Sequence, residues 1–213
     1  MGKGTMAFKQ AKRAFCTALI CVVALGGAAL ADTFRIVGFG DSLMAGYNLG
    51  PDEGFPQKLE AALRARGHDV TVANAGVSGD TTSGGLSRLE WSVPDGTDLV
   101  ILELGANDML RGLSPQAAEK NLDRMMASLQ QRGIGIVLAG MYAAPNLGPD
   151  YVEAFNGMYP RLAEKYGAPL IPFFLDGVAA NPSMQLEDGL HPNAAGVERM
   201  VESALPIVEP LVK

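Results

Sequence analysis

The chain has 213 residues, of which 48% are apolar, with 17 Lys and Arg against 23 Asp and Glu and a net charge of −6. An acidic balance of this kind disfavours nucleic acid and anionic membrane surfaces as partners. Both cysteines, Cys16 and Cys21, lie near the N-terminus, so the rest of the chain can form no disulfide, thiol nucleophile or cysteine metal site.

Residues 1–31 have the pattern of a secretory signal peptide. Four basic residues, the last of them Arg13, precede an uncharged stretch whose most apolar part, 15–25, is short for a membrane span. Ala29-Leu30-Ala31 is a small-x-small cleavage site. We therefore predict export to the periplasm or the medium, with an uncleaved membrane anchor as the alternative. The remaining domain, 32–213, keeps 13 basic and 23 acidic residues and a net charge of −10.

In that domain, short apolar runs alternate with longer segments of helical period. Strands are predicted for Thr33–Phe39, Val70–Ala73, Leu99–Leu104, Ile134–Ala139 and Pro169–Phe173. Helices are predicted from Pro56, over 116–132 after the N-cap Ser114 and Pro115, over 151–165 with a bend or break at Pro160, and from Pro192 towards Leu205. This alternation predicts one open parallel sheet with helices on both faces, whose ligands bind beyond the carboxyl ends of the strands.

The first such loop, GFGDSLMAG at 38–46, allows three interpretations. A dinucleotide fingerprint lacks its third glycine, because Leu43 stands there. A metal site could use Asp41, Asp80 and Asp108, which all follow strands, but no strand end offers paired carboxylates and basic residues for phosphate are sparse. The third interpretation is a nucleophilic Ser42 on a tight turn, although a serine at a helix start is commonly only a cap.

A nucleophilic serine requires a base and a carboxylate that orients the base. The chain has two histidines. His68 lies in a polar turn before a strand, at the wrong end of the sheet. His191 follows the last strand, and Pro192 favours a non-helical conformation for it. Asp188, three residues earlier, can turn back towards one ring nitrogen, so these residues are candidates for base and orienting acid.

Donors for a negative oxygen are available in two further loops. Gly79 follows the second strand and permits an unusual φ, so that its N–H can point into the site. Asn107 follows the third strand and offers a side-chain amide. Ser42, Gly79, Asn107 and His191 would all lie at the same edge of the sheet.

These residues resemble the SGNH, or GDSL, hydrolase family over essentially the whole domain. GDSLMAGY at 40–47, SGDTT at 78–82 and ELGANDMLRG at 103–112 are similar to the secreted bacterial thioesterase, lysophospholipase and arylesterase branch. Ala106 departs from the Gly-Gly-Asn-Asp of the family and adds a methyl group near the oxyanion site. The resemblance implies a three-layer α/β/α sandwich around a flavodoxin-like five-stranded parallel sheet, with no cofactor and no metal.

The resemblance also implies roles for the candidate residues. Ser42 would attack the acyl carbon, with His191 as base and then acid and Asp188 as its orienting partner. The N–H groups of Ser42 and Gly79 and the Asn107 amide would form the oxyanion hole.

Apolar residues beside these motifs suit an acyl chain or an aromatic ester, although any one of them could be ordinary core. They are Met44, Tyr47, Met109, Leu110, Leu113, Met141 and Tyr142. We therefore predict a serine esterase acting on aryl, fatty-acyl or lysophospholipid esters, or on thioesters. The alternatives are a carbohydrate O-acetylesterase and a non-catalytic binding domain of the same fold. We expect a monomer whose partner is a small or lipid-like ester, with at most peripheral contact with membrane lipids.

Overall fold

A computed structural model of the chain describes residues 1–2 and 33–213. The signal peptide predicted for residues 1–31 therefore lies almost entirely outside the described residues. Within 33–213, the sheet has five parallel strands in the order β2-β1-β3-β4-β5. The strands are β1 (Phe34–Gly40), β2 (Val70–Gly76), β3 (Leu99–Glu103), β4 (Gly135–Ala139) and β5 (Leu170–Ile171).

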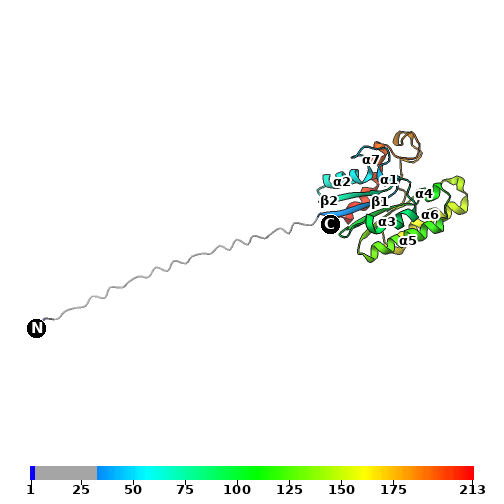
Figure 1. Cartoon of the computed structure of the whole chain (residues 1–213). Coiled ribbons are helices and arrows are strands. Elements are labelled where there is room, and N and C mark those ends of the chain that lie inside the picture. The colour runs from blue at the N-terminus through cyan, green and yellow to red at the C-terminus, as the bar shows by residue number, and fades with distance from the viewer. Residues whose placement is uncertain (3–32) are drawn as a thin grey trace. The chain divides into compact units, whose positions relative to one another are not determined.

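Helices cover both faces of this sheet, which gives the three-layer α/β/α sandwich (Figure 1). On one face, α2 (Phe55–Ala65) packs against α7 (Ala194–Val208). On the other face, α5 (Pro115–Gln131) packs between α3 (Thr82–Ser92) and α6 (Pro149–Tyr166). Shorter segments are α1 (Ser42–Ala45), α4 (Ala106–Leu110), η1 (Pro145–Leu147), η2 (Pro182–Met184) and η3 (Glu209–Leu211).

The strand sequences explain why the sheet lies in the middle layer. All five residues of β3 are buried, as are the last five residues of β1, and continuous apolar burial is the pattern of a parallel strand covered on both faces. Helix starts follow the capping residues: the Ser114 side chain accepts the Ala117 N–H, and the Asn193 side chain accepts the Gly196 N–H.

Two expectations from the sequence differ from the structure. Of the predicted bend or break at Pro160, the break is wrong, because α6 continues through this residue from Pro149 to Tyr166. The predicted last strand is shorter than expected, with only Leu170 and Ile171 paired to β4. Pro169 and Pro172 flank this pair, and proline has no N–H to donate to a sheet ladder.

The strand order fixes where a ligand can bind. From β1 the chain passes to β2 on one side and then crosses to β3 on the other, so the switch in strand order falls between β1 and β3. Beyond the carboxyl ends of these two strands lie Ser42 and Asn107. Open α/β sheets bind their ligands at such a switch point.

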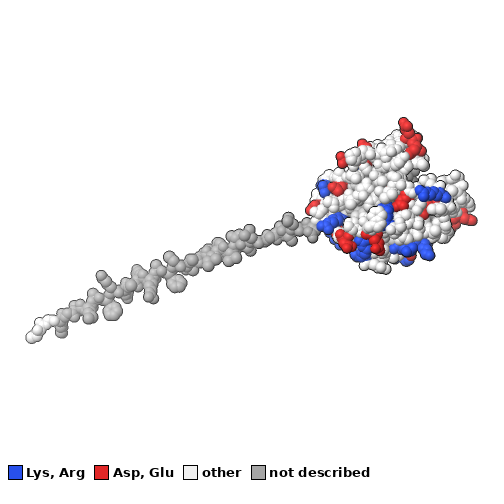
Figure 2. Space-filling model, viewed as in Figure 1, with Lys and Arg blue, Asp and Glu red and all other residues white. Residues whose placement is uncertain are grey.

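The described surface carries both signs of charge. Figure 2 shows Lys and Arg side chains interspersed with Asp and Glu side chains on one face, with extensive uncharged surface between them. Each helix within residues 33–213 is too short or too polar to cross a lipid bilayer.

Candidate active site

Ser42 and His191 meet at the carboxyl edge of the sheet. Ser42 is the first residue of α1, directly after β1, and His191 lies in the loop before α7. The His191 Nε2 lies 2.8 Å from the Ser42 Oγ, although the two residues are 149 positions apart. The other ring nitrogen, Nδ1, lies 2.7 Å from Asp188 Oδ2. A carboxylate at Nδ1 favours the tautomer with its proton there, which leaves Nε2 free to accept the serine proton.

The Asp188 carboxylate is held by its own loop. Its Oδ1 accepts the backbone N–H groups of Leu190 at 2.9 Å and His191 at 3.0 Å. These two backbone bonds, with the His191 ring, lower the pKa of Asp188 from 3.8 to about 2. Gly189, at φ 66°, makes the turn that brings the carboxylate back to the ring. Asp188 is therefore ionised over the neutral pH range and can stabilise a protonated imidazole.

Tyr47 covers the other side of the histidine. Its ring centroid lies 4.4 Å from that of His191, with the two planes inclined by 34°. An aromatic contact at this distance restricts the orientation of the imidazole. Tyr47, predicted from sequence as a substrate contact, thus lies against the candidate base rather than in the wall of the neighbouring cavity.

The candidate oxyanion donors lie just after β2 and β3, Gly79 in a loop and Asn107 in α4. Gly79 has φ 80°, and its carbonyl oxygen accepts a hydrogen bond from Arg111 Nη2 at 2.6 Å. Its N–H makes no hydrogen bond within the described chain. Asn107 Nδ2 donates one hydrogen to Asp41 Oδ2 at 2.9 Å, and its second hydrogen remains available. Because an ionised carboxylate accepts only, this bond also fixes which end of the Asn107 amide carries the nitrogen.

Asp41 connects the turn at Ser42 to the Asn107 amide. It is the N-cap of α1, where its Oδ1 accepts the Leu43 N–H at 3.0 Å, and it is buried. Its two oxygens thus hold α1 and Asn107 in one arrangement. From the sequence, Asp41 was considered only as a possible metal ligand, and nothing in the local sequence indicates its contact with Asn107, 66 residues away.

Arg88 binds the backbone just before the Ser42 turn, and the sequence did not indicate this role. Its guanidinium donates to the carbonyl oxygens of Gly40 and Ala75, both at 2.8 Å, and to Asp80 Oδ2 at 2.7 Å. It also lies 4.0 Å from the centroid of the Phe39 ring. Arg88 and Asp80 are both largely buried. One buried cation therefore fixes the ends of β1 and β2 relative to each other.

An apolar cavity of about 330 Å³ opens beside Ser42, Asn107 and His191. Four of the predicted substrate contacts line it: Met109, Leu110, Met141 and Tyr142. Tyr142 stacks on Phe173, with ring centroids 4.7 Å apart. The last loops add wall residues that the sequence analysis did not select, namely Phe173, Leu175, Ala179, Ala180 and Leu190. Phe173 ends the last predicted strand and the other four residues follow it, and this position was the available signal.

Met44 and Leu113, also predicted as substrate contacts, do not line the cavity. Met44 is fully buried in the core, where its sulfur occupies the space beside Gly38. Leu113 is exposed, and its carbonyl oxygen accepts the Tyr151 hydroxyl at 2.9 Å. His68 lies away from the site, with Nε2 3.2 Å from Glu209 Oε1.

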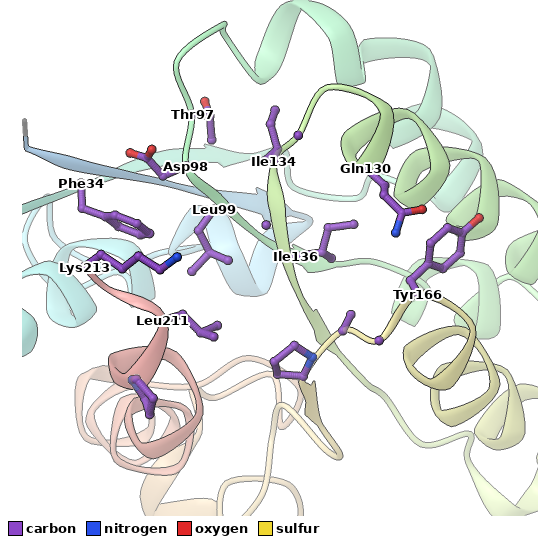
Figure 3. Close-up of a pocket in the computed structure, with 16 residues that line it drawn as sticks. Phe34, Thr97, Asp98, Leu99, Gln130, Ile134, Ile136, Tyr166, Leu211 and Lys213 are labelled. Atoms are coloured by element: carbon purple, nitrogen blue, oxygen red, sulfur yellow. The ribbon is translucent and has the colours of Figure 1, made fainter.

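A larger hollow, of about 610 Å³, lies at the opposite, amino edge of the sheet. Figure 3 shows Phe34, Leu99 and Ile136 on its walls, with Leu211 and Lys213 of the C-terminal segment beside them. Its charged members are Asp98 and Lys213, and Asp98 accepts the Arg35 N–H at 2.7 Å. This hollow contains none of the candidate catalytic residues, so size alone does not identify the site.

The aspartates considered for a metal site have separate partners. Asp41 binds Leu43 and Asn107, Asp80 pairs with Arg88, and Asp108 accepts the N–H and hydroxyl of Thr82 at 2.8 and 2.7 Å. In the part of the chain that the structure describes, no group of three or more His, Cys, Asp or Glu side chains is placed to hold a metal ion.

The chain is similar in sequence and in fold to known proteins. The model of the GDSL-like Lipase/Acylhydrolase family matches residues 39–199. An arylesterase of Vibrio mimicus is 42% identical over 159 residues, which are 74% of this chain and 80% of the relative. Thioesterase 1/protease 1/lysophospholipase L1 of Escherichia coli (strain K12) is 35% identical over 186 residues, 87% of each chain. The crystal structure of TesA superposes with a TM-score of 0.79 at 38% identity, covering 83% of this chain and 99% of TesA.

Proposed function

Because the chain belongs to the GDSL-like lipase/acylhydrolase family and is a serine esterase, we propose that Ser42, His191 and Asp188 are its catalytic triad. The observation that carries the proposal is the unbroken chain of contacts from Ser42 Oγ to His191 Nε2 at 2.8 Å and from His191 Nδ1 to Asp188 at 2.7 Å. A hydroxyl, an imidazole and a carboxylate in this order form the arrangement that activates a serine.

Hydrolysis proceeds in two steps. His191 Nε2 takes the proton of Ser42 as Oγ bonds to the acyl carbon, and the carbonyl oxygen becomes negative. The Ser42 N–H, the Gly79 N–H and the free Asn107 hydrogen donate to that oxygen. His191 then passes the proton to the leaving alcohol or thiol, whose bond to the acyl carbon breaks. In the second step His191 takes a proton from a water molecule as the water oxygen bonds to the acyl carbon, and it then returns the proton to Ser42 Oγ as the bond from Oγ to the acyl carbon breaks and the acid leaves.

The apolar cavity wall indicates that the part of the substrate bound beside Ser42 is an acyl or aryl group. Met109, Met141, Tyr142 and Phe173 offer apolar surface. This apolar surface is extended by three exposed side chains that follow β3, β4 and β5: Leu110, Tyr142 and Leu190. A sugar would require a polar wall, so the cavity favours aryl, fatty-acyl or lysophospholipid esters over acetylated carbohydrate.

We further propose that residues 1–31 are removed on export and that the domain 32–213 acts in the periplasm or outside the cell as a monomer. All residues of the proposed triad and oxyanion hole come from one chain, which supports a monomer as the active unit. N-terminal sequencing of the protein recovered from its host tests the cleavage, and a mature chain that begins at Met1 would contradict it.

A fluorophosphonate probe and the Ser42→Ala variant test the proposed nucleophile. Mass spectrometry should find one adduct on Ser42 in the native enzyme and none in the variant, and ester turnover should disappear with the adduct. EDTA should leave turnover unchanged. An unlabelled Ser42 would indicate a non-catalytic binding domain, and faster release of acetate from acetylated xylan than of nitrophenol from medium-chain esters would indicate a carbohydrate esterase.

A further inference from the structure

Besides Asp41, a second buried carboxyl group, that of Glu103, contacts the turn at Ser42, and the proposed hydrolysis does not use it. Glu103 is the last residue of β3, and its exposed fraction is 0%. Its Oε2 accepts the backbone N–H of Asp41 at 3.1 Å. Its Oε1 is buried without a hydrogen-bond partner among the described residues. A buried polar atom left in this way is destabilising, so its presence at this position requires an explanation.

The close approach of Glu103 depends on Gly40. A Cβ atom at position 40 would collide with Glu103 Oε2 and would lie 2.6 Å from the Glu103 backbone oxygen. The glycine of the nucleophile motif therefore leaves the space in which the carboxyl group lies. The Glu103 carboxyl group thus contacts Asp41, the residue before Ser42, although Glu103 comes 61 positions after Ser42 in the chain.

The contacts of Glu103 and Asp41 indicate which of the two carries charge. Glu103 Oε2 accepts the Asp41 N–H, so the two carboxyl groups belong to hydrogen-bonded residues in one buried region. Both oxygens of Asp41 accept N–H groups, from Leu43 and from Asn107, whereas Glu103 accepts one N–H and leaves Oε1 idle. Burial, and then the charge of Asp41, raise the pKa of Glu103 well above its usual range. Two neighbouring buried carboxyl groups do not both ionise readily, and these contacts favour Asp41 as the anion and Glu103 as the group that retains its proton.

The other elements around the pair leave this assignment intact. Tyr159 from α6 is buried and donates its hydroxyl to the Leu104 carbonyl oxygen at 3.1 Å, so it neutralises neither carboxyl group. Arg88 from α3 donates to the Gly40 carbonyl oxygen and to Asp80. His191 faces Asp41 and lowers its pKa, although burial is the larger effect and raises it. Within residues 33–213, no basic side chain forms an ion pair with Glu103.

We propose that Glu103 is a positioning residue of the esterase reaction: as a neutral acid it anchors Asp41 and, through Asp41, the Ser42 N–H and the Asn107 amide. The inference rests on the proposed oxyanion hole. Asp41 precedes Ser42, so fixing the Asp41 N–H fixes the peptide that carries the Ser42 N–H. The Asp41 carboxylate in turn holds Asn107. An ionised Glu103 would place a second negative charge beneath the oxyanion and would oppose its formation.

Two substitutions at this position distinguish positioning from packing. Glu103→Gln retains a neutral acceptor and donor of the same shape, whereas Glu103→Leu fills the space but leaves the Asp41 N–H unpaired. We expect kcat of Glu103→Leu to fall roughly 10- to 100-fold, since loosened oxyanion donors lose part of the roughly 10²- to 10³-fold effect of a removed donor. Its KM should change less than about twofold, because uniform substrate binding in the cavity is untouched. Glu103→Gln should retain kcat within about threefold of the native value.

The measurement is kcat per active serine, with the serine counted by complete fluorophosphonate labelling. Val100→Ala, a buried truncation on the same strand, serves as the matched control: it should lower thermal stability without changing kcat per labelled serine. If Glu103→Leu does not accumulate, the infrared spectrum of the native protein at neutral pH provides the second measurement. It should contain the carbonyl band of a protonated carboxylic acid, and Glu103→Gln should lack that band.

Three results would overturn the proposal. The first is a folded Glu103→Leu with native kcat per labelled serine, which would reduce Glu103 to packing. The second is a Gln variant as impaired as the Leu variant. The third is a native protein with no protonated carboxylic acid that the Gln substitution removes. Failure of labelling in every variant would instead refute Ser42 as the nucleophile, which is a separate conclusion.

Discussion

Replacing Asn107 with alanine should separate catalysis from stability in a measurable way. The Asn107 amide donates one hydrogen to Asp41 Oδ2 at 2.9 Å and has a second hydrogen available for the oxyanion. Removing an oxyanion donor decreases kcat by roughly 10²- to 10³-fold, which corresponds to about 2.7–4 kcal/mol of transition-state stabilisation. We expect this decrease in kcat, with KM nearly unchanged because the apolar cavity remains.

The same substitution also leaves a buried carboxylate oxygen unpaired. Asp41 is only 1% exposed, so loss of the Asn107 donor should lower the free energy of unfolding by about 1–3 kcal/mol. For a domain of this size each kcal/mol shifts the melting temperature by roughly 2–4 °C. Stability is measured by urea and thermal unfolding, and kcat by hydrolysis of a medium-chain nitrophenyl ester under saturating substrate.

Asn121→Ala is the matched control for this experiment. Asn121 lies on α5 and donates its amide to Thr82 Oγ1 at 3.1 Å, and it makes no hydrogen bond to the proposed triad or oxyanion donors. Its loss should lower the free energy of unfolding by about 1 kcal/mol and leave kcat unchanged. If Asn107→Ala retained kcat within about threefold of the native enzyme, the assignment of Asn107 as an oxyanion donor would be refuted, whatever the change in stability.

Three further substitutions test other parts of the site. The pKa of Asp188 is about 2 in the folded chain, below its ordinary 3.8, so its contribution to stability is present above pH 4 and is lost as pH falls towards 2. Asp188→Asn should therefore lose less unfolding free energy, measured in urea, between pH 4 and pH 2 than the native protein. An identical pH dependence of the unfolding free energy in both proteins would contradict the expectation. Tyr142→Ala removes an apolar ring from the cavity wall. A loss of about 1 kcal/mol of contact with the substrate corresponds to a roughly fivefold rise in KM, so KM for long-chain and aryl esters should rise by this factor with little change for acetyl esters; an equal rise for all esters would argue against a cavity contact. Arg88→Met leaves the Asp80 carboxylate largely buried without its partner and should lower the free energy of unfolding by about 3–5 kcal/mol; an unchanged urea midpoint would contradict the structural role of Arg88.

The sequence predicted the layer architecture because its strands are short and apolar and its helices have recognisable starts. It did not predict α3, which contains Gly84 and Gly85, residues that weaken a helix in isolation. Packing explains this helix: a Cβ at Gly85 would collide with the Leu104 side chain, so the glycine allows the helix to lie close to the sheet. The continuity of α6 through Pro160 has a similar cause, since Phe155, Tyr159 and Leu162 are buried on its inner face.

In the candidate site, too, some residues could be predicted from the sequence and others could not. Ser42, Gly79, Asn107 and His191 could be selected because each follows a predicted strand and carries the appropriate chemistry. The contacts beneath them could not be selected, because they join residues that are distant in the chain. Arg88 reaches Gly40 across 48 positions, and Glu103 reaches Asp41 across 62. The protonation state of a buried acid depends on such a neighbour, and no local pattern records it.

The hollow at the amino edge of the sheet indicates how the enzyme can be attached to a support. Phe34, at the start of β1, and Lys213 line the same hollow (Figure 3). Ser42 and the apolar cavity lie at the carboxyl edge. A bead, electrode or partner domain coupled through Lys213 would therefore face away from the entrance for esters. Immobilised enzyme joined by this end should hydrolyse bulky esters as readily as enzyme in solution, whereas coupling through Arg111, whose side chain binds the Gly79 loop, should hinder them.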